Sequence, residues 1–292
     1  MNADDFAFFQ KFLRDKSGMA LGDDKLYLLE SRLSPVMRKW MFGNLEEMAR
    51  ALRLTPDKKL VSEVINAMVT NETLFFRDDR PFKHFRTNML PSLLEARKQK
   101  KSIRVWSAAC STGQEPYSIA MTALETIPRA EVWNVEILGT DISEHALNQA
   151  MKGEYTQFEI QRGLPMQMAM KYFQQQGQGW RVNDKIRSMI RYEAFNLLDR
   201  MEKFGSFDVI FCRNVLIYFD EATKKHVLDN LISRLAPDGY LFLGGAESVI
   251  NICPNLKAHP DCPGLYTVAS PSKAKESKPV TNTIALKPLV KV

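Results

Sequence analysis

The segment VWSAACSTGQEPYSIA, from Val105 to Ala120, contains the most informative change of pattern in this chain. An apolar run typical of a buried strand meets a turn of small residues, and a helical pattern then opens at Glu115 and Pro116. A strand that ends in small residues before a helix leaves room for a ligand where free backbone N–H groups collect. We therefore expect a nucleotide-like cofactor at this turn.

A second apolar run, VEILGTDIS, ends with Asp141 about one βαβ unit later. An acidic residue at the tip of the second strand of such a unit is where a ribose diol is held. The chain has no GxGxxG motif, and the first turn contains only Gly113. This argues against a pyrophosphate on the backbone and favours a smaller cofactor such as S-adenosylmethionine.

The composition is that of a globular protein with two domains: 292 residues, of which 45% are hydrophobic and 25% charged. The apolar runs are too short to span a membrane, and the first residues carry acids where a signal peptide carries bases. We expect a cytoplasmic protein without membrane insertion. The cysteines lack CxxC spacing, so we expect reduced, mostly buried thiols and no metal: Cys110, Cys212, Cys253 and Cys262.

The net charge of +6 is concentrated in the first third of the chain, where bases outnumber acids in residues 25–59 and 77–104. This favours an acidic partner for that part. A solvated helical surface followed by a charged linker explains the charges equally well.

Changes of hydrophobic period divide the chain into regions. Helical spacing from Asp4 to about Phe85 predicts a small all-helical N-terminal domain, residues 1–88, of four or five helices. Residues 89–270 alternate between strand and helix patterns, which predicts an α/β fold with a doubly wound, mostly parallel, Rossmann-like sheet. We expect a helix ending in a charged connector at 91–101, and further helices at 115–127, 143–151 and 221–235. Strands are expected at 103–107, 134–140, 188–195, 207–212, 239–244 and 264–270.

Two regions fall outside this alternation. Residues 153–191 are polar and rich in Gln, and WRVNDKIRSMIRYEAF alternates at period two, which predicts an inserted antiparallel β-hairpin appended to the sheet. Residues 271–292 are rich in Lys, Ser, Pro and Thr and are expected to be a disordered tail.

Five separated motifs, in one order, resemble the chemotaxis receptor glutamate methyltransferase family, the CheR-type enzymes among class I S-adenosylmethionine-dependent methyltransferases. They are NETLFFRD (71–78), VWSAACSTGQEPYSIAM (105–121), DIS (141–143), FNLLD (195–199) and FDVIFCRNVLIYFD (207–220). The resemblance extends from about Phe6 to Val268. It implies methyl transfer from S-adenosylmethionine to glutamate side chains on the cytoplasmic helices of chemoreceptors, giving methyl esters and S-adenosylhomocysteine for sensory adaptation.

The resemblance also implies site residues. Tyr218 would be catalytic and stand near the transferred methyl, and Arg77 would reach the cofactor. We also expect Arg77 to be catalytic by orienting the incoming carboxylate, because a guanidinium fork matches its two oxygens. The cofactor would be held by Asn71, Thr73, Arg77, Glu115, Asp141, Asn196, Leu197, Arg213 and Asn214. Simpler explanations remain for three of them: Asn71 could cap a following helix, Glu115 could complement the helix dipole, and Tyr218 could be a half-buried core aromatic.

Substrate recognition is expected on the helix KLYLLESRLSPVMRKWM. Its bases can form one edge facing an acidic receptor helix, and the resemblance points to the same helix: Lys25, Arg32, Arg38 and Lys39. They could equally be ordinary exposed bases on an amphipathic helix. We expect a monomer whose partner is the chemoreceptor cytoplasmic domain.

The chain departs from the family pattern in three places. Gln114 precedes Glu115 where many relatives have two glutamates, and Gly245 and Ala246 replace a histidine and a serine ahead of Glu247, which leaves the role of that loop in doubt. Some relatives dock a receptor pentapeptide on the inserted hairpin. Its loop, QQQGQGWRV, is short here, so tight pentapeptide docking is not expected.

Two other functions remain possible from the sequence. An RNA methyltransferase would fit the pI near 9.0. However, the bases are not interleaved with aromatic stacking platforms, so we expect no nucleic-acid partner. A non-catalytic module that binds the cofactor in signalling is the other, although Arg77, Asp141, Asn214 and Tyr218 are all present.

Overall fold

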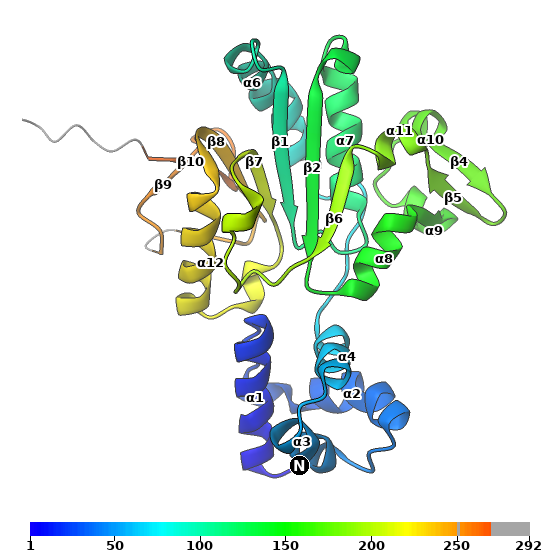
Figure 1. Cartoon of the computed structure of the whole chain (residues 1–292), viewed down its shortest axis with the longest axis vertical. Coiled ribbons are helices and arrows are strands. Elements are labelled where there is room, and N and C mark those ends of the chain that lie inside the picture. Colours follow the sequence, from blue (N-terminus) through cyan, green and yellow to red (C-terminus); the bar gives the residue numbers. More distant parts are fainter. Residues whose placement is uncertain (250–251, 270–292) are drawn as a thin grey trace, which may run out of the picture.

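The computed structural model describes residues 1–249 and 252–269. Its centre is a seven-stranded sheet in the order β6-β2-β1-β7-β8-β10-β9 (Figure 1). The first five strands in this order are parallel, and β10 pairs antiparallel with both β8 and β9. The strands are β1 (Ser102–Ala108), β2 (Asn134–Asp141), β6 (Ile190–Ala194), β7 (Phe207–Cys212), β8 (Leu235–Leu243), β9 (Leu256–Ala258) and β10 (Leu265–Val268).

The strand order reverses direction at β1. The chain passes from β1 outward to β2 and β6, and then returns to the other side of β1 to form β7 and β8. In doubly wound sheets the ligand binds outside the carboxyl ends of the strands at such a reversal. The segments after β1, β2 and β7 are therefore the ones that can meet around a ligand.

Both faces of the sheet are covered, and every residue of β7 is buried. Helices α5 (Arg80–His84), α6 (Leu90–Ala96) and α7 (Gln114–Thr126) contribute to the core on one face. Helix α12 (Glu221–Ser233) packs on the other face, around Trp106 and Leu241. Burial on both faces explains why these strands have continuous apolar runs. The doubly wound fold predicted from the sequence is confirmed.

The N-terminal helices form a separate core: α1 (Ala3–Ser17), α2 (Leu26–Trp40), α3 (Leu45–Leu54) and α4 (Lys58–Met68). Side chains of Asn2, Asn44 and Asp57 cap three of these helices at their N-termini. The core ends at Met68, whereas Phe75, Phe82 and Phe85 pack with the central sheet. The domain boundary at residue 88 stays a prediction, but residues 75–85 share a core with the second domain. Figure 1 shows the helical domain (blue) facing the carboxyl ends of the central strands.

The inserted region contains an antiparallel hairpin, as predicted, but the hairpin belongs to a separate sheet and is not appended to the central one. This separate antiparallel sheet has three strands, in the order β3 (Glu154–Thr156), β5 (Gly179–Val182) and β4 (Phe173–Gln176). Two short helices, α9 (Gln157–Gln161) and α10 (Met166–Tyr172), connect β3 to β4 along the chain. The period-two segment after Trp180 is not one strand. The side chain of Asn183 accepts a hydrogen bond from the Ile186 N–H and starts a short helix, α11 (Asp184–Arg187), so the chain leaves this sheet and enters β6.

Smaller differences lie at element ends. Helix α6 begins at Leu90 and ends at Ala96, and the charged connector expected after it starts at Arg97, which pairs with Asp208 and Asp238. Helix α8 (Glu144–Lys152) follows β2 as expected.

The four cysteines are free and buried. No helix in residues 1–249 and 252–269 is long and apolar enough to cross a membrane. The predicted tail lies outside the described residues.

Candidate active site

A cavity lies at the carboxyl edge of the central sheet, where the helical domain and the segment after α4 close over it. Ser17 and Met19 reach it from the end of α1, and the remaining lining comes from residues 69–77 and from the segments after β1, β2, β6 and β7. All ten cofactor and catalytic residues predicted from the sequence line this cavity: Asn71, Thr73, Arg77, Glu115, Asp141, Asn196, Leu197, Arg213, Asn214 and Tyr218. Their individual roles stay predictions.

Asp141 ends β2 with its carboxylate buried. One oxygen accepts the Ser111 N–H at 2.8 Å and the other accepts the Ser143 N–H at 2.9 Å. A carboxylate has about four acceptor positions, so acceptor capacity remains for donors in the cavity. Burial raises the pKa of the Asp141 carboxyl above its usual value, while the N–H groups of Ser143 and Ser111 oppose that rise. This arrangement suits a ligand with two adjacent hydroxyls.

We expect Asp141→Ala to weaken S-adenosylhomocysteine binding by about 1 to 3 kcal/mol, because hydrogen bonds to a charged acceptor are lost. Hydroxyl donors stabilise the ionised carboxylate, so the pKa must be lower in the complex than in the free protein. The affinity should therefore be full above the raised pKa of the free protein and fall as the pH drops through it. Calorimetry from neutral pH downward measures both effects.

Asp208 supplies the matched control, because it is also buried but lies at the amino end of β7. Asp208→Asn should keep the affinity within about twofold, since it touches no part of the cavity. Asp141→Asn should flatten the pH dependence. Wild-type affinity in Asp141→Ala would exclude this carboxylate from the site.

The loop between β1 and α7 is held in an unusual conformation. Ala109 and Ser111 have positive φ, and Gly113 has a φ of +95°. A Cβ at Gly113 would lie 2.8 Å from that of Ala150, so only glycine fits there. Ser111 Oγ donates to the Asn71 carbonyl, and Tyr155 from the small sheet donates to the Thr112 carbonyl. The Asn71 carbonyl is thus tied to the loop after β1. No helix begins in the described chain between Asn71 and α5, so the capping interpretation is wrong.

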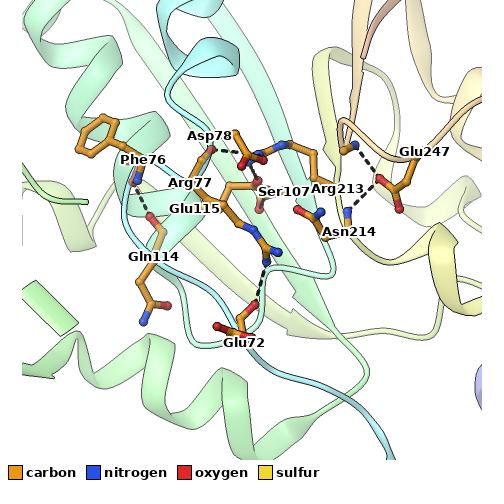
Figure 2. A network of polar contacts seen from close by, with 12 residues as sticks. Glu72, Phe76, Arg77, Asp78, Ser107, Gln114, Glu115, Arg213, Asn214 and Glu247 are labelled. Carbon is orange, nitrogen blue, oxygen red and sulfur yellow. Dashed lines mark hydrogen bonds and ion pairs between the residues drawn. The ribbon is translucent and has the colours of Figure 1, made fainter. Parts of the chain in front are cut away.

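Arg213, after β7, is almost fully buried and occupied by protein groups. Its guanidinium pairs with Glu115 at 2.9 Å and with Asp78 at 2.6 Å, and also donates to the Arg77 carbonyl. Glu115 accepts a further bond from Ser107. Figure 2 shows Arg213 beside Asp78 and Glu115. This network fixes the strained turn around residues 76–79, where Phe76, Asp78 and Asp79 have positive φ.

Arg77 projects from this turn into the cavity (Figure 2). One of its terminal nitrogens donates to the Glu72 carbonyl at 3.0 Å. Within the described residues, the guanidinium makes no other hydrogen bond, so donors remain for a ligand. Tyr218 also lines the cavity and packs against the core around α12, which agrees with both interpretations of this residue.

Asn196 is partly committed elsewhere. Its amide nitrogen donates to the Lys16 carbonyl at 2.7 Å, and its oxygen accepts from the Leu198 N–H. Asn196 therefore ties the segment after β6 to the end of α1. Its neighbour Leu197 is buried and adds an apolar surface to the cavity.

The predicted substrate-binding bases lie on the helical domain, outside the cavity. Lys25 pairs with Asp24, Lys39 with Glu63, and Arg32 donates to the Met68 carbonyl and to Thr70. Arg38 is exposed and donates only to Ser34 within the part of the chain that the structure describes. All four bases thus have a partner, and Arg38, whose described side-chain partner is a neutral hydroxyl, is the one most available to an acidic helix.

The contacts of Glu247 were not predicted from the sequence. Its buried carboxylate accepts hydrogen bonds from the backbone of the segment after β7, which carries Asn214 and Tyr218. A signal was present: Glu247 follows the last parallel strand, β8, by four residues, so it had to lie at the carboxyl edge.

Family models match almost all of this architecture. Residues 4–69 match the all-alpha domain of CheR methyltransferase, and residues 71–259 match its S-adenosylmethionine-binding domain. The chain belongs to the CheR methyltransferase family. The second match includes every strand of the central sheet except β10, and the resemblance noted in the sequence is confirmed.

Curated relatives of the CheR family support the same assignment over nearly their full length. A chemotaxis protein methyltransferase of Pseudomonas putida is 40% identical over 250 residues, covering 84% of this chain and 90% of the relative. One of Pseudomonas aeruginosa is 39% identical over 266 residues, covering 89% and 96%. This CheR protein is therefore an S-adenosylmethionine-dependent methyltransferase of chemotaxis.

Solved structures match more distantly. The magnesium protoporphyrin IX methyltransferase of Synechocystis, with bound S-adenosylhomocysteine, has a TM-score of 0.32 and 18% identity, covering 64% of this chain and 71% of that one. A likeness of this size adds nothing to the site.

Proposed function

We propose that this protein transfers methyl groups from S-adenosylmethionine to glutamate side chains on the cytoplasmic helices of chemoreceptors. The observation that supports it most is the single cavity that joins a buried strand-end carboxylate, Asp141, to an arginine with free donors, Arg77. The first suits a cofactor with a ribose diol, and the second suits an acidic substrate.

The residues present fit the cofactor. Asp141 has acceptor positions for the ribose hydroxyls, and the apolar side chains of Ile142, Phe195 and Leu197 suit one face of an adenine. Glu115 carries a charge for an amino group, although Arg213 already shares it. When bound, S-adenosylmethionine supplies a methyl group on a positively charged sulfur, and its transfer to a carboxylate oxygen gives a methyl ester and S-adenosylhomocysteine.

The substrate glutamate that accepts the methyl group needs no general base. A glutamate carboxyl has a reference pKa of about 4.3, so it is already ionised and nucleophilic at neutral pH. Cys110 and Cys212 lie at this edge of the sheet, but burial raises the pKa of both thiols well above the usual value, and they stay neutral. The chain has to orient the carboxylate and exclude water from it.

Arg77 is the residue we assign to orienting the carboxylate, because a guanidinium fork matches its two oxygens. The contact with the Glu72 carbonyl leaves only part of the guanidinium for the substrate. A partial contact is favourable, since tight holding would stabilise the ground state as much as the transition state. Arg38, exposed on α2, would attract the acidic receptor helix from outside the cavity.

The chemistry of the product tests this proposal. Labelled S-adenosylmethionine is incubated with the protein and with either a chemoreceptor cytoplasmic fragment or total RNA. Label that appears on the fragment and is released as methanol by mild base supports a glutamate methyl ester. Base-stable label, or label on RNA alone, would refute the proposal and favour the RNA methyltransferase. Cofactor binding without transfer to either acceptor would favour the non-catalytic module.

We also expect no tight binding of a receptor C-terminal pentapeptide. Strands β4 and β5 are joined only by Gly177 and Gln178, so the hairpin loop offers few side chains to a peptide. Calorimetry with the peptide should show no micromolar binding, with S-adenosylhomocysteine as the positive control on the same sample. A micromolar dissociation constant would contradict this expectation.

A further inference from the structure

Glu247 is a buried carboxylate that accepts hydrogen bonds from the backbone of residues 214–217 and of Gly244. One oxygen accepts the N–H groups of Gly244 and Asn214 at 2.6 and 2.8 Å. The other accepts those of Val215, Leu216 and Ile217 at 2.9, 2.7 and 3.3 Å. Hydrogen bonds to a charged acceptor are about twice as strong as neutral ones, so this single side chain anchors the whole turn.

The anchored turn carries two residues of the candidate site. Asn214 begins it, with a φ of +57°, and Tyr218 ends it. The helical domain also meets the turn there, because the Ala20 N–H donates to the Tyr218 carbonyl and Met19 bridges to Phe219. Figure 2 shows Glu247 against the backbone of Asn214, on the side of the turn away from Arg77.

We propose that Glu247 is a positioning residue for methyl transfer: its carboxylate holds the 214–218 turn so that Tyr218 faces the reacting groups. Glu247 is absent from the lining of the cavity, so it acts through the turn and not on a ligand. The role of Glu247 in methyl transfer rests on the proposed function. Its role in holding the turn does not.

The turn requires an acceptor with two oxygens. Glutamine would place an NH₂ group against at least two backbone N–H groups, which leaves buried donors unpaired and facing one another. Gly244 is part of the same packing: a Cβ there would lie 2.7 Å from a Glu247 oxygen and 3.0 Å from the Asn214 nitrogen. A Cβ at the adjacent Gly245 would meet nothing within 4 Å.

The first test compares transfer rate with cofactor affinity in Glu247→Gln. Displacement of Tyr218 should lower the rate at saturating cofactor by about 10²-fold. The dissociation constant of S-adenosylhomocysteine should rise by no more than about fivefold, because Asn214 offers one contact among many. Tyr218→Phe should add little in the Glu247→Gln background, since both changes act through the same group. Full additivity, or a rate within about threefold of wild type, would overturn the inference.

Substitutions at Gly244 and Gly245 provide a second test that does not depend on whether Glu247→Gln folds. Gly244→Ala should lower the rate and speed hydrogen exchange at the amides of residues 214–217, whereas Gly245→Ala should do neither. Equal effects of the two changes would overturn the inference. If the wild type methylates no receptor fragment, the proposed function fails, and amide exchange still reports whether Glu247 anchors the turn.

Discussion

Replacing Arg77 with alanine is expected to lower methyl transfer to a receptor fragment by about 10²- to 10³-fold, the cost of removing one preorganised donor from a reacting carboxylate. The side chain lines the cavity with donors that no described residue uses. Because Asp141 and Leu197 lie on other segments, S-adenosylhomocysteine binding should weaken much less than the rate. Initial rates at saturating cofactor, with calorimetry of the same samples, measure the two effects separately.

Arg77→Lys and Arg80→Ala are the controls. Lysine keeps the charge but loses the planar fork, so Arg77→Lys should recover only part of the rate. Arg80 is exposed, lies three residues away and does not line the cavity, so Arg80→Ala should leave the rate unchanged. A wild-type rate in Arg77→Ala would remove this arginine from the mechanism.

Among the substitutions considered, Arg213→Met should destabilise the protein most. It should lower the free energy of unfolding by about 3 to 5 kcal/mol. The side chain of Arg213 is 2% exposed and that of Glu115 is 12% exposed, so the change leaves a buried carboxylate without its partner. The pair with Asp78 adds little, because the side chain of Asp78 is 55% exposed. Urea denaturation at neutral pH measures the loss.

A second substitution separates the unpaired charge from lost packing. Arg213→Met combined with Glu115→Gln removes both charges and should recover much of the stability, because no buried ion is then left uncompensated. Arg129→Met breaks an exposed pair with Glu131 and should cost less than about 0.5 kcal/mol. Equal losses in Arg213→Met and Arg129→Met would show that the buried pair is not important for stability.

Much of the fold could be predicted because the main signals are local. Buried parallel strands such as β1 and β7 appear as continuous apolar runs, and the small residues after β1 mark the cofactor turn. The structure of the inserted region, residues 153–191, was harder to predict. An Asn183 cap stops a period-two pattern and sends the chain from one sheet to another, and nothing in the alternation itself distinguishes these sheets.

The candidate site was predictable wherever a residue belongs to a motif and lines the cavity itself. Asp141 and Arg77 are of this kind. Glu247 and Asp78 act through other residues, and their partners lie far away in sequence: Glu247 bonds residues 214–217, and Asp78 pairs with Arg213. Such contacts depend on how the segments after α4, β7 and β8 meet, which only the folded chain defines.

A crystal structure of the protein with S-adenosylhomocysteine tests the central claim most directly. The account predicts the ligand at the carboxyl edge of the central sheet, with its ribose hydroxyls on the Asp141 carboxylate and its sulfur turned toward the part of the cavity that Arg77 and Tyr218 line. A ligand bound elsewhere, with the Asp141 carboxylate unliganded, would contradict it.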